Sequence, residues 1–254
     1  MNLIIWATTL IVSAIAGYLG TFMISKRMSL ASGPLSHLAL PGVALAFLFN
    51  FNPFLGALFF ILLGALIVWI LRRISSLSME TLTGISFAFG MSLGFLLLPM
   101  QHASDAIMGN ISSITLSDFY IALTFSLLIV VLVSVSYKQI VLIILSEDLA
   151  RSMKINIKFY DLLFLLSVAL TVAMEVKIVG GIVTIALMIL PASTAFNFSK
   201  NLKEYFVLSP ILGLVSSLMG LFLHENFSLP AGPLIVLCSF LIFIASLVFG
   251  MKRT

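Results

Sequence analysis

The sequence predicts an all-α fold, a polytopic bundle of about eight or nine helices that cross a membrane. Of the 254 residues, 61% are hydrophobic and 9% are charged, whereas a soluble domain carries about 25% charged residues. A membrane-spanning helix needs about 20 apolar residues, and apolar stretches of that length recur along the chain with short polar breaks between them. These breaks leave no room for a soluble domain, so we expect residues 1–254 to form one transmembrane domain.

The candidate spans are the apolar stretches between positions at which charged residues, Asn or Pro collect. In chain order they cover residues 3–24, 28–50, 53–71, 82–98, 119–135, 162–176, 178–196, 205–223 and 231–249. No small-residue cleavage pattern follows the first stretch, so we expect it to remain as a helix and not to act as a removable signal peptide. The turn at residues 175–181 is tight and residues 100–118 are candidates for a partly re-entrant segment, which leaves the count at about eight or nine.

The basic residues predict which ends of the spans face the cytoplasm, because Lys and Arg concentrate in cytoplasmic connections. They fall at alternate connections: Lys26 with Arg27, Arg72 with Arg73, Lys138 to Lys158, Lys200 with Lys203, and Lys252 with Arg253. An odd number of crossings then places the N-terminus outside and the C-terminus inside. This distribution indicates membrane topology and lipid contact, and we expect no nucleic-acid partner. The single Cys238 excludes a disulfide framework and a cysteine-rich metal site.

His37 is the strongest candidate for chemistry within a span. It ends a polar half-span, residues 28–37, that contains Gly33 and Pro34 and precedes a strongly apolar half. At 1.5 Å per residue, His37 lies roughly 15 Å beyond Arg27, near the middle of a hydrocarbon core of about 30 Å. Ionisable residues at that depth mark ion or substrate paths, and imidazole is a common ligand of first-row metals. The alternative is a histidine that only hydrogen-bonds a neighbouring helix.

The opposite connections collect further possible metal ligands. They carry Asn50 with Asn52, His102 with Asp105, Glu175 with Lys177, and His224 with Glu225. The imidazole and carboxylate pairs, His102 with Asp105 and His224 with Glu225, have the donor atoms that suit Zn or Mn and could pass a cation toward the pore. The alternative is that they are solvated loop residues. No second His follows His224 at the spacing of a zinc peptidase, so an intramembrane protease is disfavoured.

Residues 146–154 predict a short cytoplasmic helix. Ser146 suits the N-cap, and acidic residues follow it at the positive end of the helix dipole. We expect Leu149, Ala150 and Met153 to share one face that docks a soluble partner, the alternative being a helix that lies on lipid. The chain contains no phosphate-binding loop and no Gly-Lys dipeptide. Coupling to ATP hydrolysis would therefore need a separate subunit, and we expect the chain itself not to be an enzyme.

From about residue 17 to residue 236 the sequence resembles the integral-membrane permease of the zinc/manganese/iron ABC importer family. The resemblance rests on Arg27-Met-Ser-Leu followed by Ser36-His-Leu-Ala-Leu-Pro-Gly, on Ser146-Glu-Asp-Leu-Ala-Arg, on Val179-Gly, on Ala186-Leu-Met-Ile-Leu-Pro-Ala-Ser-Thr-Ala, and on Leu229-Pro-Ala-Gly-Pro. Two positions depart from the family pattern: Gly33 stands where members usually have Asp, and Phe196 where they often have Arg.

The resemblance implies a multi-pass permease of the bacterial cytoplasmic (inner) membrane, paired with a second copy of itself and two ATPase subunits. An extracytoplasmic binding protein would deliver a divalent metal, zinc as first choice and manganese as second, with no stably bound cofactor. We expect the metal path to involve His37, His224, Glu225, His102 and Asp105, and the coupling to the ATPase to involve Glu147, Leu149, Ala150, Arg151 and Met153. The alternative function is a secondary transporter of a small metabolite, which needs no ATPase.

Overall fold

The computed structural model of the chain describes residues 3–29, 31–97, 111, 114–181 and 184–250. Within these ranges every regular element is a helix and no strand occurs, so the predicted all-α fold is confirmed. The helices are α1 (Leu3–Ser25), α2 (Ser32–His37), α3 (Ala39–Phe49), α4 (Pro53–Ile74), α5 (Met79–Leu97), α7 (Leu116–Val135), α8 (Tyr137–Leu145), α9 (Glu147–Ser152), α10 (Ile157–Val179), α11 (Thr184–Phe198), α12 (Leu202–Phe227) and α13 (Ala231–Gly250).

Among the described residues, eight helical segments are long and apolar enough to cross a membrane, with α2 and α3 together forming one of them. The remaining long element, α11, has 15 residues and spans only about 22 Å. It is shorter than the expected span 178–196 because α10 continues to Val179 and α11 begins at Thr184. Eight full-length spans and one short helix agree with the predicted eight or nine.

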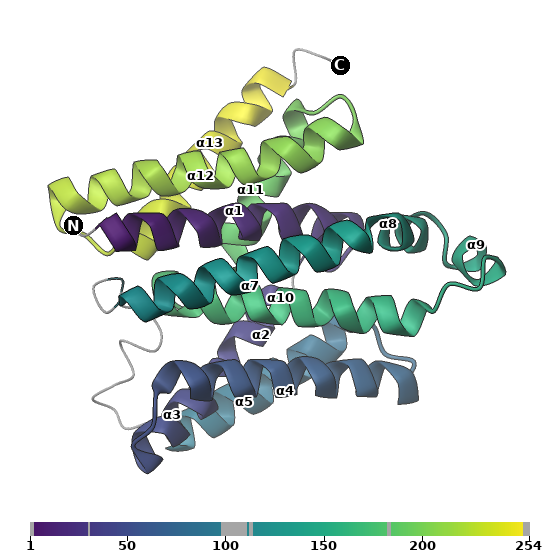
Figure 1. The fold of residues 1–254 in the computed structure, drawn as a ribbon, viewed down its shortest axis with the longest axis horizontal. Helices are drawn as coiled ribbons and strands as arrows, with labels where there is room; N and C mark the ends of the chain where they lie inside the picture. Colours follow the sequence, from purple (N-terminus) through teal and green to yellow (C-terminus); the bar gives the residue numbers. More distant parts are fainter. Residues whose placement is uncertain (1–2, 30, 98–110, 112–113, 182–183, 251–254) are drawn as a thin grey trace.

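The long helices lie side by side, and the short helices α8 and α9 project from one end of the bundle (Figure 1). Several helices begin where the sequence provides a capping residue. Asn52 accepts a hydrogen bond from the Phe54 amide next to Pro53, and Thr115 forms a capping box with Asp118 at the start of α7. Such caps satisfy backbone donors that the first turn of a helix leaves without partners.

Small residues bring α1 against α11 and α12. A Cβ atom on Gly17 would lie 2.7 Å from the carbonyl oxygen of Ser209, and one on Gly20 would overlap the carbonyl of Met188. The Ser209 hydroxyl donates to the Gly17 carbonyl across this contact. Close backbone approach and interhelical hydrogen bonds are the main sources of helix association in lipid, which explains the position of α1 inside the bundle.

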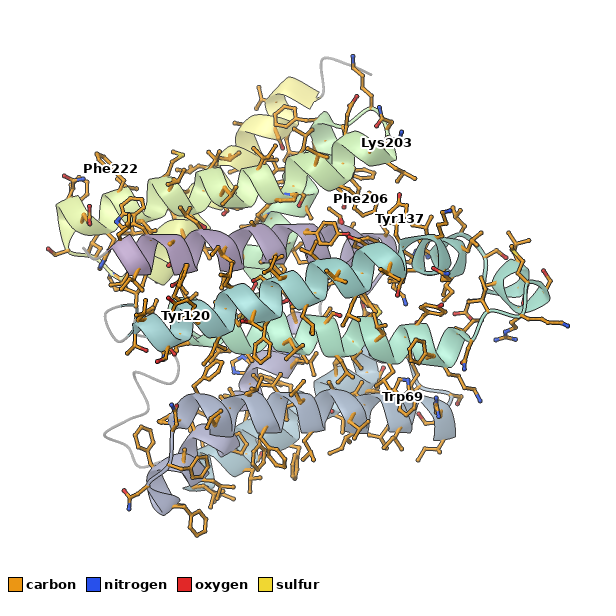
Figure 2. The ribbon with its side chains drawn as sticks, in the orientation of Figure 1. Trp69, Tyr120, Tyr137, Lys203, Phe206 and Phe222 are labelled. Atoms are coloured by element: carbon orange, nitrogen blue, oxygen red, sulfur yellow. The ribbon has the colours of Figure 1, made fainter. Side chains whose placement is uncertain are left out.

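Aromatic rings join α1, α8 and α12 toward the end from which α9 projects. The ring of Phe206 lies 4.6 Å from that of Phe22 and 5.4 Å from that of Tyr137, and Figure 2 shows Phe206 and Tyr137 close together beside α8. Tilted and edge-on ring pairs at these distances are favourable. The segment that precedes α9 is therefore packed firmly onto the membrane-spanning helices.

Candidate metal path and coupling segment

His37 is the last residue of α2, at a break within the second span. The helix of residues 28–50 predicted from the sequence does not begin until Ser32, and it is interrupted at Leu38, where α2 ends and α3 begins at Ala39. Helix α2 packs against α4, α5, α10 and α11 and lies in the interior of the ribbon (Figure 1). A broken helix within a membrane is tolerated where it is buried in protein or lines a cavity.

The imidazole of His37 lies between α5 and the turn that follows α10. Its ring packs edge-on against Phe87 at 4.9 Å between centroids, and its Nδ1 would lie 4.0 Å from a Cβ atom on Gly181. The side chain is half-buried. No residue in the described part of the chain hydrogen-bonds the imidazole.

Ser36 fastens the same turn to α2. Its Oγ lies 2.6 Å from the carbonyl oxygen of Gly181 and 2.7 Å from that of Gly33, so its single proton serves two acceptors. Gly180, with φ of 88°, occupies a backbone conformation that favours glycine. The Gly180–Gly181 turn is thereby held against the residue that precedes His37.

Glu175 was placed by the sequence on an exterior connection, and the structure corrects this. It lies inside α10 with 0% of its surface exposed, because α10 continues for four residues beyond it. Neither carboxylate oxygen has a hydrogen-bond partner among the described residues. The signal available in the sequence was a single carboxylate within the apolar run Val172-Ala-Met-Glu-Val, and the neighbouring Lys177 made this run resemble an extramembrane turn.

Lys177 has a structural partner. Its Nζ lies 2.6 Å from Oδ1 of Asp118 on α7 and 5.7 Å from the ring centroid of Phe54 at the start of α4. The ion pair ties α7 to α10, and it accounts for a basic residue on the side where the other predicted connections carry none.

His224 and Glu225 take part in contacts at the far end of α12. The Nδ1 of His224 lies 2.5 Å from the carbonyl oxygen of Leu229 in the turn before α13, and Trp6 of α1 donates to Glu225 at 3.3 Å. Helix α12 packs mainly against α1, α11 and α13, and α2 shares α11 with it as a neighbour. His102 and Asp105 lie outside the described residues. Across the described ranges, no three His, Cys, Asp or Glu side chains cluster closely enough to hold a metal.

The predicted helix at residues 146–154 is present as α9. Ser146 caps it by accepting a hydrogen bond from the Leu149 amide. Leu149 and Met153 are about half exposed, whereas Ala150 is fully buried. The expected common exposed face is therefore wrong for Ala150, which is buried because α9 packs against α8 and α10. The exposed apolar surface of α9 consists of Leu149 and Met153, with Glu147 and Arg151 paired beside it at 3.5 Å.

A cavity of about 320 Å³ joins the start of α9 to the connection between α1 and α2. Its lining includes Lys26, Arg27, Arg72, Asp161 and Glu147. Asp161, in the second turn of α10, bonds Lys26 at 2.5 Å and approaches Arg72 of α4 at 3.5 Å. One carboxylate thus connects the ends of α1, α4 and α10, directly beside the segment that leads into α2.

Comparison with known proteins agrees with this architecture. The chain is 34% identical over 250 residues to the manganese import system permease protein ScaB of Streptococcus gordonii, covering 97% of this chain and 90% of that protein. It is 31% identical over 249 residues to the high-affinity zinc uptake system membrane protein ZnuB of Buchnera aphidicola subsp. Baizongia pistaciae, covering 95% of each. A chain in the solved structure of PsaBC from Streptococcus pneumoniae in complex with Fab superimposes with a TM-score of 0.83 at 32% identity, covering 95% of this chain and 89% of that one.

These relatives and the eight apolar helices identify a multi-pass membrane protein. The match to the family described as "ABC 3 transport family" runs from residue 1 to residue 250. The chain therefore belongs to the ABC 3 transport family.

Proposed function

We propose that this chain is the permease subunit of an ATP-driven importer that moves Mn²⁺ or Zn²⁺ across the bacterial cytoplasmic membrane. The observation that carries the proposal is the imidazole of His37, which has no hydrogen-bond partner in the described residues and ends α2 at the break in a membrane-spanning segment. Relatives named for manganese and for zinc support this substrate class. The order zinc before manganese stays a prediction.

The site is suited to a transported ion. A structural zinc site surrounds the metal with four protein ligands, whereas a transporter has to release the ion that it carries. One imidazole beside a glycine turn is compatible with brief binding. The pairs His224 with Glu225 and His102 with Asp105 are proposed as exterior contacts on the way to His37.

Energy would come from a separate ATPase subunit that docks on α9. Leu149 and Met153 offer an apolar contact, and α9 borders the cavity beside the α1–α2 connection. Movement of α9 could therefore reach α2 through the Asp161 ion pairs, so that His37 opens alternately to either side. We further propose two permease copies, two ATPase subunits and an extracytoplasmic binding protein in the working assembly.

The test is uptake of radioactive manganese and zinc by liposomes that contain the assembled transporter and its binding protein. We expect the liposomes to accumulate metal only when ATP is supplied on the side that carries the ATPase subunits. Replacing ATP by a non-hydrolysable analogue should stop this accumulation. Uptake of neither metal would reject the substrate class. Uptake driven by an ion gradient without ATP would favour the secondary transporter instead.

A further inference from the structure

Glu175 is a buried carboxylate to which the proposed function assigns no role. It is fully buried, and both of its oxygens lack a hydrogen-bond partner among the residues that the structure describes. Burying an unpaired carboxylate is costly, and acidic side chains within membrane spans are rare and mark substrate or ion paths by default. A carboxylate in this position is therefore suited to bind a cation transiently.

The direction of Glu175 follows from its neighbours on α10. Lys177 points toward α7 and α4, where it meets Asp118 and Phe54. Glu175 is two residues earlier, which is about 200° around the helix at 3.6 residues per turn. It is therefore turned away from the α7 side.

Two side chains on the same face of α10 show what Glu175 faces. Phe164 and Asp161 precede it by 11 and 14 residues, close to whole numbers of helical turns, so all three lie within about 40° of one direction. Phe164 packs against Phe22 of α1 at 6.4 Å between ring centroids, and Asp161 bonds Lys26 at the end of α1. At the Asp161 end of α10 this face therefore looks into the bundle, toward α1, and Glu175 lies on the same inward face near the other end of the helix.

Glu175 lies near the end of α10 that leads to the turn beside His37. Four residues separate it from Val179, the last residue of α10, a rise of about 6 Å, and Gly181 follows two residues later. The Gly181 carbonyl lies 2.6 Å from Ser36 Oγ, and His37 Nδ1 would lie 4.0 Å from a Cβ on Gly181. Because α10 also packs against α2, the carboxylate and the imidazole belong to one interior region of the bundle.

We infer that Glu175 supplies the carboxylate that binds the divalent cation together with His37 during its passage between α10 and α2. This inference rests on the proposed function. Helix α2, with the sequence Ser-Gly-Pro-Leu-Ser-His, has no carboxylate of its own. Imidazole with carboxylate suits Mn²⁺ and Zn²⁺ alike. Two protein donors, with water completing the shell, hold the ion less firmly than the closed set of a structural site.

The experiment measures the metal concentration for half-maximal uptake by the assembled transporter in liposomes, for manganese and zinc separately. Glu175→Gln keeps the size of the side chain and removes its charge. We expect it to raise this concentration at least about tenfold, while the melting temperature and assembly with the ATPase stay those of the wild type. Asp118→Asn is the matched control, because it removes a carboxylate on the opposite side of α10 and is expected to leave the half-maximal concentration unchanged.

A second variant separates the charge of Glu175 from its packing. Gly33 lies four residues before His37 on α2, and residues so spaced share one face of a helix. A Cβ atom on Gly33 meets Ile185 Cδ1 at 3.4 Å, an ordinary contact. In the double variant Gly33→Asp with Glu175→Gln, we expect the new carboxylate to restore at least part of the lost metal affinity.

Three results decide between the proposals. Wild-type uptake of neither metal rejects the proposed function itself. If the wild type transports and Glu175→Gln has the same half-maximal concentration for both metals, the inference about Glu175 is overturned. The inference is also overturned if Glu175→Gln lowers the melting temperature and the double variant Gly33→Asp with Glu175→Gln restores no metal affinity. Glu175 would then act through packing alone.

Discussion

The Ser36 hydroxyl lies 2.6 Å from the carbonyl oxygen of Gly181, 145 residues further along the chain. This buried contact joins the broken second span to the turn between α10 and α11. It sets the position of the following residue, His37, against the glycine turn. The geometry of the proposed metal path therefore depends on pairing between two distant segments.

Replacement of Ser36 by Ala removes this contact and leaves the Gly181 carbonyl with one fewer donor. A buried hydrogen bond of this kind contributes about 1 kcal/mol. We expect Ser36→Ala to lower the melting temperature slightly and the rate of metal uptake several-fold, because His37 is less well positioned. Uptake at the wild-type rate in liposomes would show that the Ser36 contact does not position His37.

Replacement of Asp161 by Asn removes the negative charge that faces Lys26 and Arg72. The Lys26 side chain is 8% exposed, so its ammonium would lose its counter-charge in a largely buried place. We expect a loss of about 1–3 kcal/mol in stability, seen as a lower melting temperature in detergent. Glu147→Gln is the control, since its pair with Arg151 is well exposed and such pairs contribute about 0–1 kcal/mol. Equal effects of the two variants would contradict the structural role of Asp161.

Replacement of Leu149 by Arg places a charge on the exposed apolar surface of α9. Because Leu149 is 48% exposed, the permease should fold normally. We expect loss of copurification with the ATPase subunit and loss of ATP-dependent uptake. Lys203→Ala, an exposed change at the start of α12, should leave both intact. Normal association of Leu149→Arg with the ATPase would exclude α9 as the docking surface.

Replacement of Gly20 by Ala tests the close packing of α1 against α11. The new Cβ would overlap the Met188 carbonyl, and overpacking of this kind costs about 1–3 kcal/mol. Gly84→Ala on α5 is the matched control, because a Cβ there has nothing within 4 Å. We expect Gly20→Ala to melt at a lower temperature than the wild type and Gly84→Ala at an equal or higher one. The opposite order would contradict the α1–α11 contact.

Much of this fold was predictable from the sequence, because a helix that crosses a lipid bilayer needs a long apolar stretch, and polar or capping residues stand at its ends. The spans follow from apolar runs, and the Ser146 cap follows from its side chain. The break at Leu38 was not located from the sequence, because Gly33 and Pro34 lie inside the first turn of α2. Glu175 was misplaced because a carboxylate two residues from Lys177 resembles an exposed turn. Only tertiary packing shows that Lys177 pairs with Asp118 on one side of α10 while Glu175 points to the other. Likewise, the burial of Ala150 depends on how α9 rests against its neighbours, which periodicity does not specify.

The central claim is that His37 binds the transported metal, and uptake by His37→Ala tests it most directly. The assembled transporter in liposomes, with its ATPase and binding protein, would be supplied with radioactive manganese or zinc. Thr83→Ala is the control, since its hydroxyl bonds the carbonyls of Met79 and Glu80 in its own helix α5. We predict that His37→Ala, folded and assembled like the wild type, loses at least about tenfold in uptake at low metal concentration, whereas Thr83→Ala does not. Wild-type uptake of both metals by His37→Ala would contradict the claim.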